Sequence, residues 1–118
     1  MILVDTSIWV EHLRSGCPRL QQLLLAGIVD CHPFVIGELS CGNLRNRRET
    51  LGLLERLPQL AVAEDREVQH LVETRALYGK GLGWVDVHLL ASVMIARESL
   101  WTLDQPLAKV ANELGVGD

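Results

Sequence analysis

The chain has 118 residues, 48% of them hydrophobic, which is enough for one hydrophobic core, so we expect a single domain over residues 1–118. Its longest charge-free apolar stretch, residues 87–96, is too short to span a membrane, and the absence of a visible secretory signal or paired cysteines predicts a reduced, cytoplasmic protein. The 11 basic and 15 acidic residues give a formal net charge of −4, which argues against binding nucleic acid through a generally basic surface.

Short apolar runs alternate with stretches of helical periodicity along the whole chain. In chain order we expect a strand at residues 2–4, helices at 8–14 and 18–26, a strand at 28–31, helices at 34–41 and 48–57, a strand at 60–63, helices at 66–78 and 86–98, a strand at 100–103 and a helix at 105–114. The glycine-rich residues 79–83 form a loop, and the tail 115–118 has room only for the stub of a final edge strand. This alternation predicts an α/β fold in which helices cover both faces of a parallel sheet.

Four carboxylates fall in positions that call for an explanation. Asp5 and Asp104 directly follow two of the expected strands, and ligands of open parallel sheets bind at the carboxyl ends of the strands. Glu38 and Asp86 lie three or four residues from apolar side chains of their helices, on faces expected to be buried. Each has an ordinary alternative: the three aspartates could cap helices, and Glu38 could be a salt-bridged core residue.

Considered together, the four acids require compensation, because two like charges about 4 Å apart repel by about 4 kcal/mol at an effective dielectric near 20. Raised pKa values could neutralise some of the acids, or a hard divalent cation could bind; oxygen-only ligands suit Mg²⁺ or Mn²⁺. The histidines are scattered and we expect them to be structural or exposed. Their positions are 12, 32, 70 and 88.

Four segments together resemble the PIN-domain ribonucleases, and in particular the toxins of bacterial VapBC toxin–antitoxin pairs. They are residues 2–9 (ILVDTSIW), 35–39 (VIGEL), 83–91 (GWVDVHLLA) and 100–104 (LWTLD). The resemblance covers essentially the whole chain and implies a three-layer α/β/α fold with a parallel sheet of about four to five strands. It also implies an acidic quartet holding Mg²⁺ or Mn²⁺ at the carboxyl ends of the strands. Asp5, Glu38, Asp86 and Asp104 match the quartet, with Thr6, Ser7 and Thr102 as supporting hydroxyls.

By this resemblance the chain would hydrolyse RNA phosphodiester bonds with the help of a metal ion. Asp5, Asp86 and Asp104 would ligate the ion, and Glu38 would be a ligand or orient water. The family further implies a cognate antitoxin whose carboxy-terminal segment blocks the site, and a toxin that pairs with itself. Two rival functions remain open at this stage: a receiver-like regulatory domain and a noncatalytic RNA-binding domain.

Local positive charge would have to bring RNA to this negative edge. Arg45, Arg47 and Arg48 follow the helix that carries Glu38, and Lys80 lies in the glycine-rich loop; all four could contact phosphates. The alternative is a solvated helix face on which the arginines pair with neighbouring glutamates. Of the three tryptophans, we expect only Trp84, at the edge of the loop, to be exposed.

Overall fold

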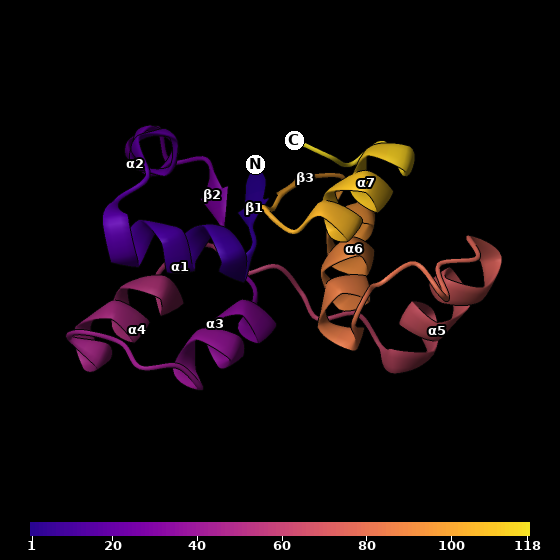
Figure 1. Ribbon diagram of the computed structural model, residues 1–118, viewed down its shortest axis with the longest axis horizontal. Helices are drawn as coiled ribbons and strands as arrows, with labels where there is room; N and C mark the ends of the chain where they lie inside the picture. Colours follow the sequence, from indigo (N-terminus) through magenta and orange to yellow (C-terminus); the bar gives the residue numbers. More distant parts are fainter.

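The computed structural model describes residues 1–118 and has a small parallel sheet surrounded by helices. The elements are β1 (Ile2–Val4), α1 (Thr6–Ser15), α2 (Pro18–Leu25), β2 (Val29–Asp30), α3 (Pro33–Ser40), α4 (Arg47–Glu55), α5 (Asp65–Thr74), α6 (Trp84–Ala96), β3 (Ser99–Trp101) and α7 (Gln105–Glu113). Helices α1 to α4 gather toward one end of the long axis and α5 to α7 toward the other, with the sheet between them (Figure 1). The alternation of strands and helices predicted from the sequence is therefore present.

The sheet has the order β2-β1-β3, and both pairings are parallel. The central strand β1 aligns Ile2 with Val29 on one side and with Ser99 on the other. Because all the strands run the same way, their carboxyl ends share one edge of the sheet. The segments that carry Asp5 and Asp104 leave the sheet at this edge.

The prediction of four to five strands was wrong, because the sheet has three. Residues 60–63 contribute no strand: one bridge joins Cys31 to Gln59, and the carbonyl of Ala61 then accepts a hydrogen bond from the Ser92 side chain at 2.8 Å. The tail likewise forms one bridge, between Leu100 and Gly117. Both segments lie where edge strands would be. In residues 60–63 a side-chain partner takes the place of a backbone ladder, and the tail is too short to form one.

Helix α5 ends at Thr74, four residues before its predicted end at Tyr78. Ala76 adopts a left-handed conformation, with φ of 51°, and the amide of Leu77 returns to the carbonyl of Val72 at 2.9 Å. This turn buries the Leu77 side chain. The positive φ interrupts the helix at a residue that is not glycine, so no local sequence signal marks the end.

One cluster of 23 buried apolar side chains forms the core. Helix α6 lies at its centre and buries seven consecutive residues, from Val87 to Val93, as expected for a helix that is apolar on most sides. This packing fixes the first turn of α6, which carries Asp86, relative to the rest of the fold. None of the seven helices has the length and apolar character needed to cross a membrane.

Candidate active site

The four sequence-predicted acids lie at the carboxyl edge of the sheet and around it. Asp5 follows β1, Asp104 is the residue before α7, and Asp86 lies in the first turn of α6. Burial raises the pKa of Asp86, and the negative charges of Asp5 and Asp104 raise it further. Glu38 comes from α3 and is joined to the residue after Asp5, since the Thr6 hydroxyl donates to Glu38 Oε1 at 2.7 Å.

Asp5 is held by hydroxyl groups from two distant segments. Its side chain is only 6% exposed, and its Oδ2 accepts from Ser7 Oγ at 2.8 Å and from Thr102 Oγ1 at 2.7 Å. The Ser7 hydroxyl also accepts a hydrogen bond from the Leu103 amide, and the Thr102 hydroxyl accepts one from the Asp104 amide, each at 3.0 Å. This network joins the end of β1 to the end of β3. Although Asp5 is the N-cap residue of α1, its carboxylate caps no amide there, so it forgoes the ~1 kcal/mol that a cap contributes.

Asp104 is the N-cap residue of α7, whereas the N-cap position of α6 belongs to Gly83 and Asp86 lies three residues later, in the third position of a capping box. Asp86 Oδ2 accepts the Gly83 amide at 2.8 Å, and Asp104 Oδ2 accepts the Leu107 amide at 3.0 Å. The hydrogen bond from Gly83 favours the charged form of Asp86, but burial has the larger effect and its pKa is raised. Capping and participation in a site are therefore compatible roles for these two aspartates.

Glu38 does not lie in the core, and the alternative of a salt-bridged core residue was wrong. Helix α3 buries Val35 and Leu39, whereas Glu38 is exposed and makes no ion pair. Its carboxylate borders a hollow of about 460 Å³ between α1 and the segment after α3, a hollow that Thr6 and Arg45 also line. The acid thus lies at the edge where a substrate could reach it.

The four carboxylates share one arrangement, in which a single oxygen accepts protein hydrogen bonds. That oxygen is Oδ2 in the three aspartates and Oε1 in Glu38; the second oxygen of each accepts none from the protein. No three of the chain's Asp, Glu, His or Cys side chains lie close enough together to enclose an ion. The donor set nevertheless fits Mg²⁺ or Mn²⁺, since such ions keep several waters and take one or two carboxylates directly.

Two histidines, His32 and His88, are fully buried. The His32 Nδ1 accepts the Phe34 amide at 2.9 Å, and its Nε2 lies 3.0 Å from Ser92 Oγ. The His88 Nε2 lies 3.2 Å from Asp65 Oδ1. Burial and, to a smaller extent, the nearby His88 lower the pKa of His32 to about 4. His32 is thus a packed, uncharged side chain at the start of α3.

The predicted RNA-binding arginines differ in their surroundings. Arg45 borders the hollow beside Glu38, and Arg48 is exposed without an ion pair. Arg47 donates to the carbonyls of Ser40, at 2.6 Å, and Gly42, at 3.2 Å. Arg47 therefore joins the end of α3 to the start of α4, whereas the other two guanidinium groups are not engaged by the protein.

The alternative pairing with neighbouring glutamates is absent, because no ion pair joins these arginines to Glu49 or Glu55. Lys80, in the loop before α6, is paired instead: its Nζ lies 3.7 Å from Glu113 Oε2. Both side chains of that pair are about half exposed, so the pair contributes little to stability.

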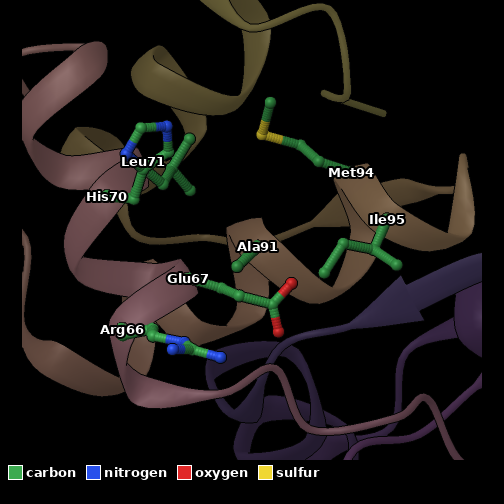
Figure 2. A pocket seen from close by; sticks show the side chains of 7 residues that line it. All are labelled: Arg66, Glu67, His70, Leu71, Ala91, Met94 and Ile95. Carbon is green, nitrogen blue, oxygen red and sulfur yellow. The ribbon is translucent and has the colours of Figure 1, made fainter.

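Another hollow lies away from the acidic edge. It lies between α5 and α6, has a volume of about 550 Å³ and is lined by Glu67, His70 and Leu71 on one side and by Ala91, Met94 and Ile95 on the other (Figure 2). None of the four predicted site acids borders it. Size alone therefore does not identify the candidate site.

The Gly83 amide, which fixes Asp86, is a site group that the sequence-based predictions missed. The signal was available, because an acid three residues after a helix cap has the spacing of a capping box. By contrast, the sequence has no signal for the two hydrogen bonds that Ser7 and Thr102 donate to the same oxygen of Asp5. These residues are 95 positions apart, and only the fold brings them together.

No protein-family model matches the chain. Two curated relatives do: Ribonuclease VapC32 of Mycobacterium tuberculosis strain CDC 1551 / Oshkosh and Ribonuclease VapC32 of strain ATCC 25618 / H37Rv. Each is 47% identical over 117 residues, which cover 98% of this chain and 94% of the relative. Identity at this level over this length indicates common descent and a shared fold.

Proposed function

Since the chain belongs to the VapC-type PIN-domain ribonucleases, we propose that it is an endoribonuclease that hydrolyses RNA phosphodiester bonds with Mg²⁺ or Mn²⁺. The observation that carries the metal dependence is the set of four carboxylates at one edge, each with one oxygen fixed and one oxygen free. The relationship favours this function over a receiver-like domain or a noncatalytic RNA-binding domain. The fold supports it as well, because ligands of parallel sheets bind at this edge.

Asp5, Asp86 and Asp104 would hold the ion, directly or through water. When bound, it supplies the positive charge that polarises the phosphoryl oxygen and acidifies the attacking water. The chain's own contribution is rigid placement of the three acids. Ser7 and Thr102 fix Asp5, and backbone amides fix the other two aspartates. Fixed charges need no reorganisation during the reaction.

Glu38 has a different position from the aspartates and, we infer, a different role. It is exposed and is held through one oxygen by Thr6, which leaves the other oxygen free to accept a proton from water. A carboxylate in this state orients a water molecule and acts as a general base within hydrogen-bond reach. Glu38 would therefore direct the attacking water or complete the ligand set.

Arginine and lysine side chains next to the acids would bind the phosphates that flank the cleaved bond. Arg45 borders the same hollow as Glu38; Arg47 and Arg48 follow it in the first turn of α4, and Lys80 lies in the loop before α6. Local contacts of this kind attach RNA despite the net charge of −4, because phosphate binding depends on nearby cations.

The chain would act as the toxin of a toxin–antitoxin pair and would form a homodimer. The hollow beside Glu38 is lined by Val10 and Leu13, both exposed apolar side chains of α1, together with Arg14. An antitoxin segment with apolar and acidic side chains fits such a lining. Expression of the wild-type chain should stop bacterial growth, and expression of an Asp5→Asn variant should not.

Replacement of Asp5 or Asp86 with Asn tests the proposed reaction, with Glu55→Gln as a matched control at an exposed acid outside the site. We expect both Asn variants to unfold at temperatures close to that of the wild type and to lose RNA cleavage. We expect the control to cleave RNA normally, and we expect a chelator to stop wild-type cleavage until Mg²⁺ or Mn²⁺ is returned. A folded Asn variant that cleaves at the wild-type rate would refute the proposed role of these acids.

A further inference from the structure

A third hollow lies beside the acidic edge, and the proposed function does not explain it. It has a volume of about 360 Å³ and is formed by the end of α5, the loop over residues 77–83 and the first turn of α6. Hollows that bind small ligands usually measure about 300–1,000 Å³. This one is thus large enough for one flat ring system and its immediate attachment.

Two exposed aromatic side chains, Tyr78 and Trp84, line the hollow. Tyr78 is 65% exposed and Trp84 45% exposed, although the chain has only three tryptophans, one tyrosine and one phenylalanine. Leu77 and Val87, both buried, provide an apolar floor. Two of five aromatic side chains thus border one open cavity, and neither is needed to fill the core.

Gly83 belongs both to the wall of this hollow and to the acidic site. It lines the cavity, and its amide donates to Asp86 Oδ2 at 2.8 Å. The Trp84 ring packs edge-on against His88, with ring centroids 4.8 Å apart, and His88 in turn packs against Phe34 at 4.7 Å. Phe34 is four residues, one helical turn, before Glu38 on α3. The hollow therefore opens next to the acids, not on a remote face.

We propose that the hollow lined by Tyr78 and Trp84 binds an unpaired base of the RNA strand whose phosphate lies at the acidic edge, an inference that rests on the proposed function. Single-stranded RNA is recognised mainly by stacking of splayed-out bases on aromatic side chains. The base stacks on Trp84 or Tyr78, and its apolar face covers Leu77 and Val87. The neighbouring phosphate is then within reach of the carboxyl edge.

The single charged side chain in the wall favours binding of a base over binding of a phosphate. Glu73 is the only charged side chain lining the hollow, and its carboxylate repels phosphate. A carboxylate accepts hydrogen bonds from the amino and imino groups of bases, and the amide of Gln69, also in the lining, can donate as well as accept. A base with an exposed amino group fits this combination.

Binding of short single-stranded RNA to an Asp5→Asn background tests this site without relying on cleavage. Trp84 is the most exposed of the three tryptophans, since Trp9 is buried and Trp101 is half-buried, so stacking should quench its fluorescence. In this background Trp84→Leu should weaken binding at least about fivefold, and Trp84→Phe, which keeps a flat ring, should retain most of it. Ile95→Ala, at an exposed apolar residue of the other large hollow, should bind like the background.

An abasic nucleotide, moved along the same oligonucleotide, separates stacking from a general disturbance of the fold. At one position it should weaken binding by a factor close to that of Trp84→Leu, and it should have no further effect in the Trp84→Leu variant. The base site is overturned if no abasic position changes the affinity, so that every abasic oligonucleotide binds as tightly as the intact RNA, both to the Asp5→Asn parent and to its Trp84→Leu variant. Base-dependent binding without any cleavage by the wild-type chain would instead uphold the base site and overturn the proposed function.

Discussion

Acidification should destabilise the protein through His32, whose ring is completely buried. The Ser92 hydroxyl donates to the Ala61 carbonyl at 2.8 Å, so the contact between Ser92 Oγ and His32 Nε2, at 3.0 Å, requires a proton on Nε2. Nδ1 is then the acceptor of the Phe34 amide. A second proton on the ring would have to lie on Nδ1, where it would face another donor.

The size of the effect follows from the pKa. Burial lowers the pKa of His32 from 6.5 to about 4, whereas the unfolded chain takes up this proton near its ordinary value. The associated stability is complete above pH ~6.5 and is lost as the pH falls toward ~4. A difference of one in pKa corresponds to about 1.4 kcal/mol, so the loss is about 2 kcal/mol at pH ~5 and about 3 kcal/mol below pH ~4.

Urea unfolding at pH ~7.5 and pH ~5 measures this loss in the wild type, His32→Asn and His70→Asn. Asparagine can still accept the Phe34 amide as an N-cap but does not titrate; His70 is an exposed histidine of α5. The wild type and His70→Asn should each lose about 2 kcal/mol more than His32→Asn on acidification. An equal loss in all three proteins would show that other groups carry the acid sensitivity.

Three further changes have expected results. Thr102→Val removes one of two donors to the buried Asp5 and should lower RNA cleavage by about 10- to 100-fold, which single-turnover kinetics over a Mn²⁺ titration can measure; unchanged rates would contradict the role of the hydroxyl. Joint replacement of Arg45 and Arg48 with Ala should reduce the slope of log affinity against log salt by about 1.4, at ~0.7 per phosphate contact, and an unaltered slope would exclude these contacts. Arg19→Ala removes a guanidinium group that lies 4.2 Å from the ring centroid of Trp101 in β3. It should lower the free energy of unfolding by about 1 kcal/mol and leave RNA cleavage normal; loss of cleavage in an equally stable protein would contradict this.

Most helix boundaries could be predicted because local residues mark them. Pro18, Pro33 and Pro106 all lie in first turns, where a proline loses no hydrogen bond. The predictions of secondary structure were wrong where contacts between residues far apart in the sequence determine the backbone conformation. The segment at 60–63 resembles a strand in its own composition, but the Ser92 hydroxyl, 31 residues away, takes the Ala61 carbonyl.

The position of Glu38 shows the limit of a periodicity argument. Periodicity places Glu38 beside Phe34 and Val35 on a face expected to be buried; Val35 is buried, but Phe34 is only half-buried and Glu38 is exposed. Periodicity alone does not show where a helix face meets the boundary of the core. Helix α3 is eight residues long, and Glu38, in its last turn, lies beyond that boundary and contacts Thr6.

Helix capping and membership of the acidic site, treated as alternatives from the sequence, turn out to be compatible for two of the aspartates. Asp104 gives one oxygen to the Leu107 amide of α7, and Asp86 gives one to the amide of Gly83, the N-cap residue of α6; each keeps its other oxygen free. Replacing either with Ala would remove a capping hydrogen bond, worth about 1 kcal/mol, and a site oxygen together. Asn preserves the cap oxygen and removes only the charge. Asp5 makes no cap bond in α1 and is held by side-chain hydroxyls alone. Its position is therefore explained less well by helix formation than that of the other two, and its replacement by Asn is the most selective test of the site.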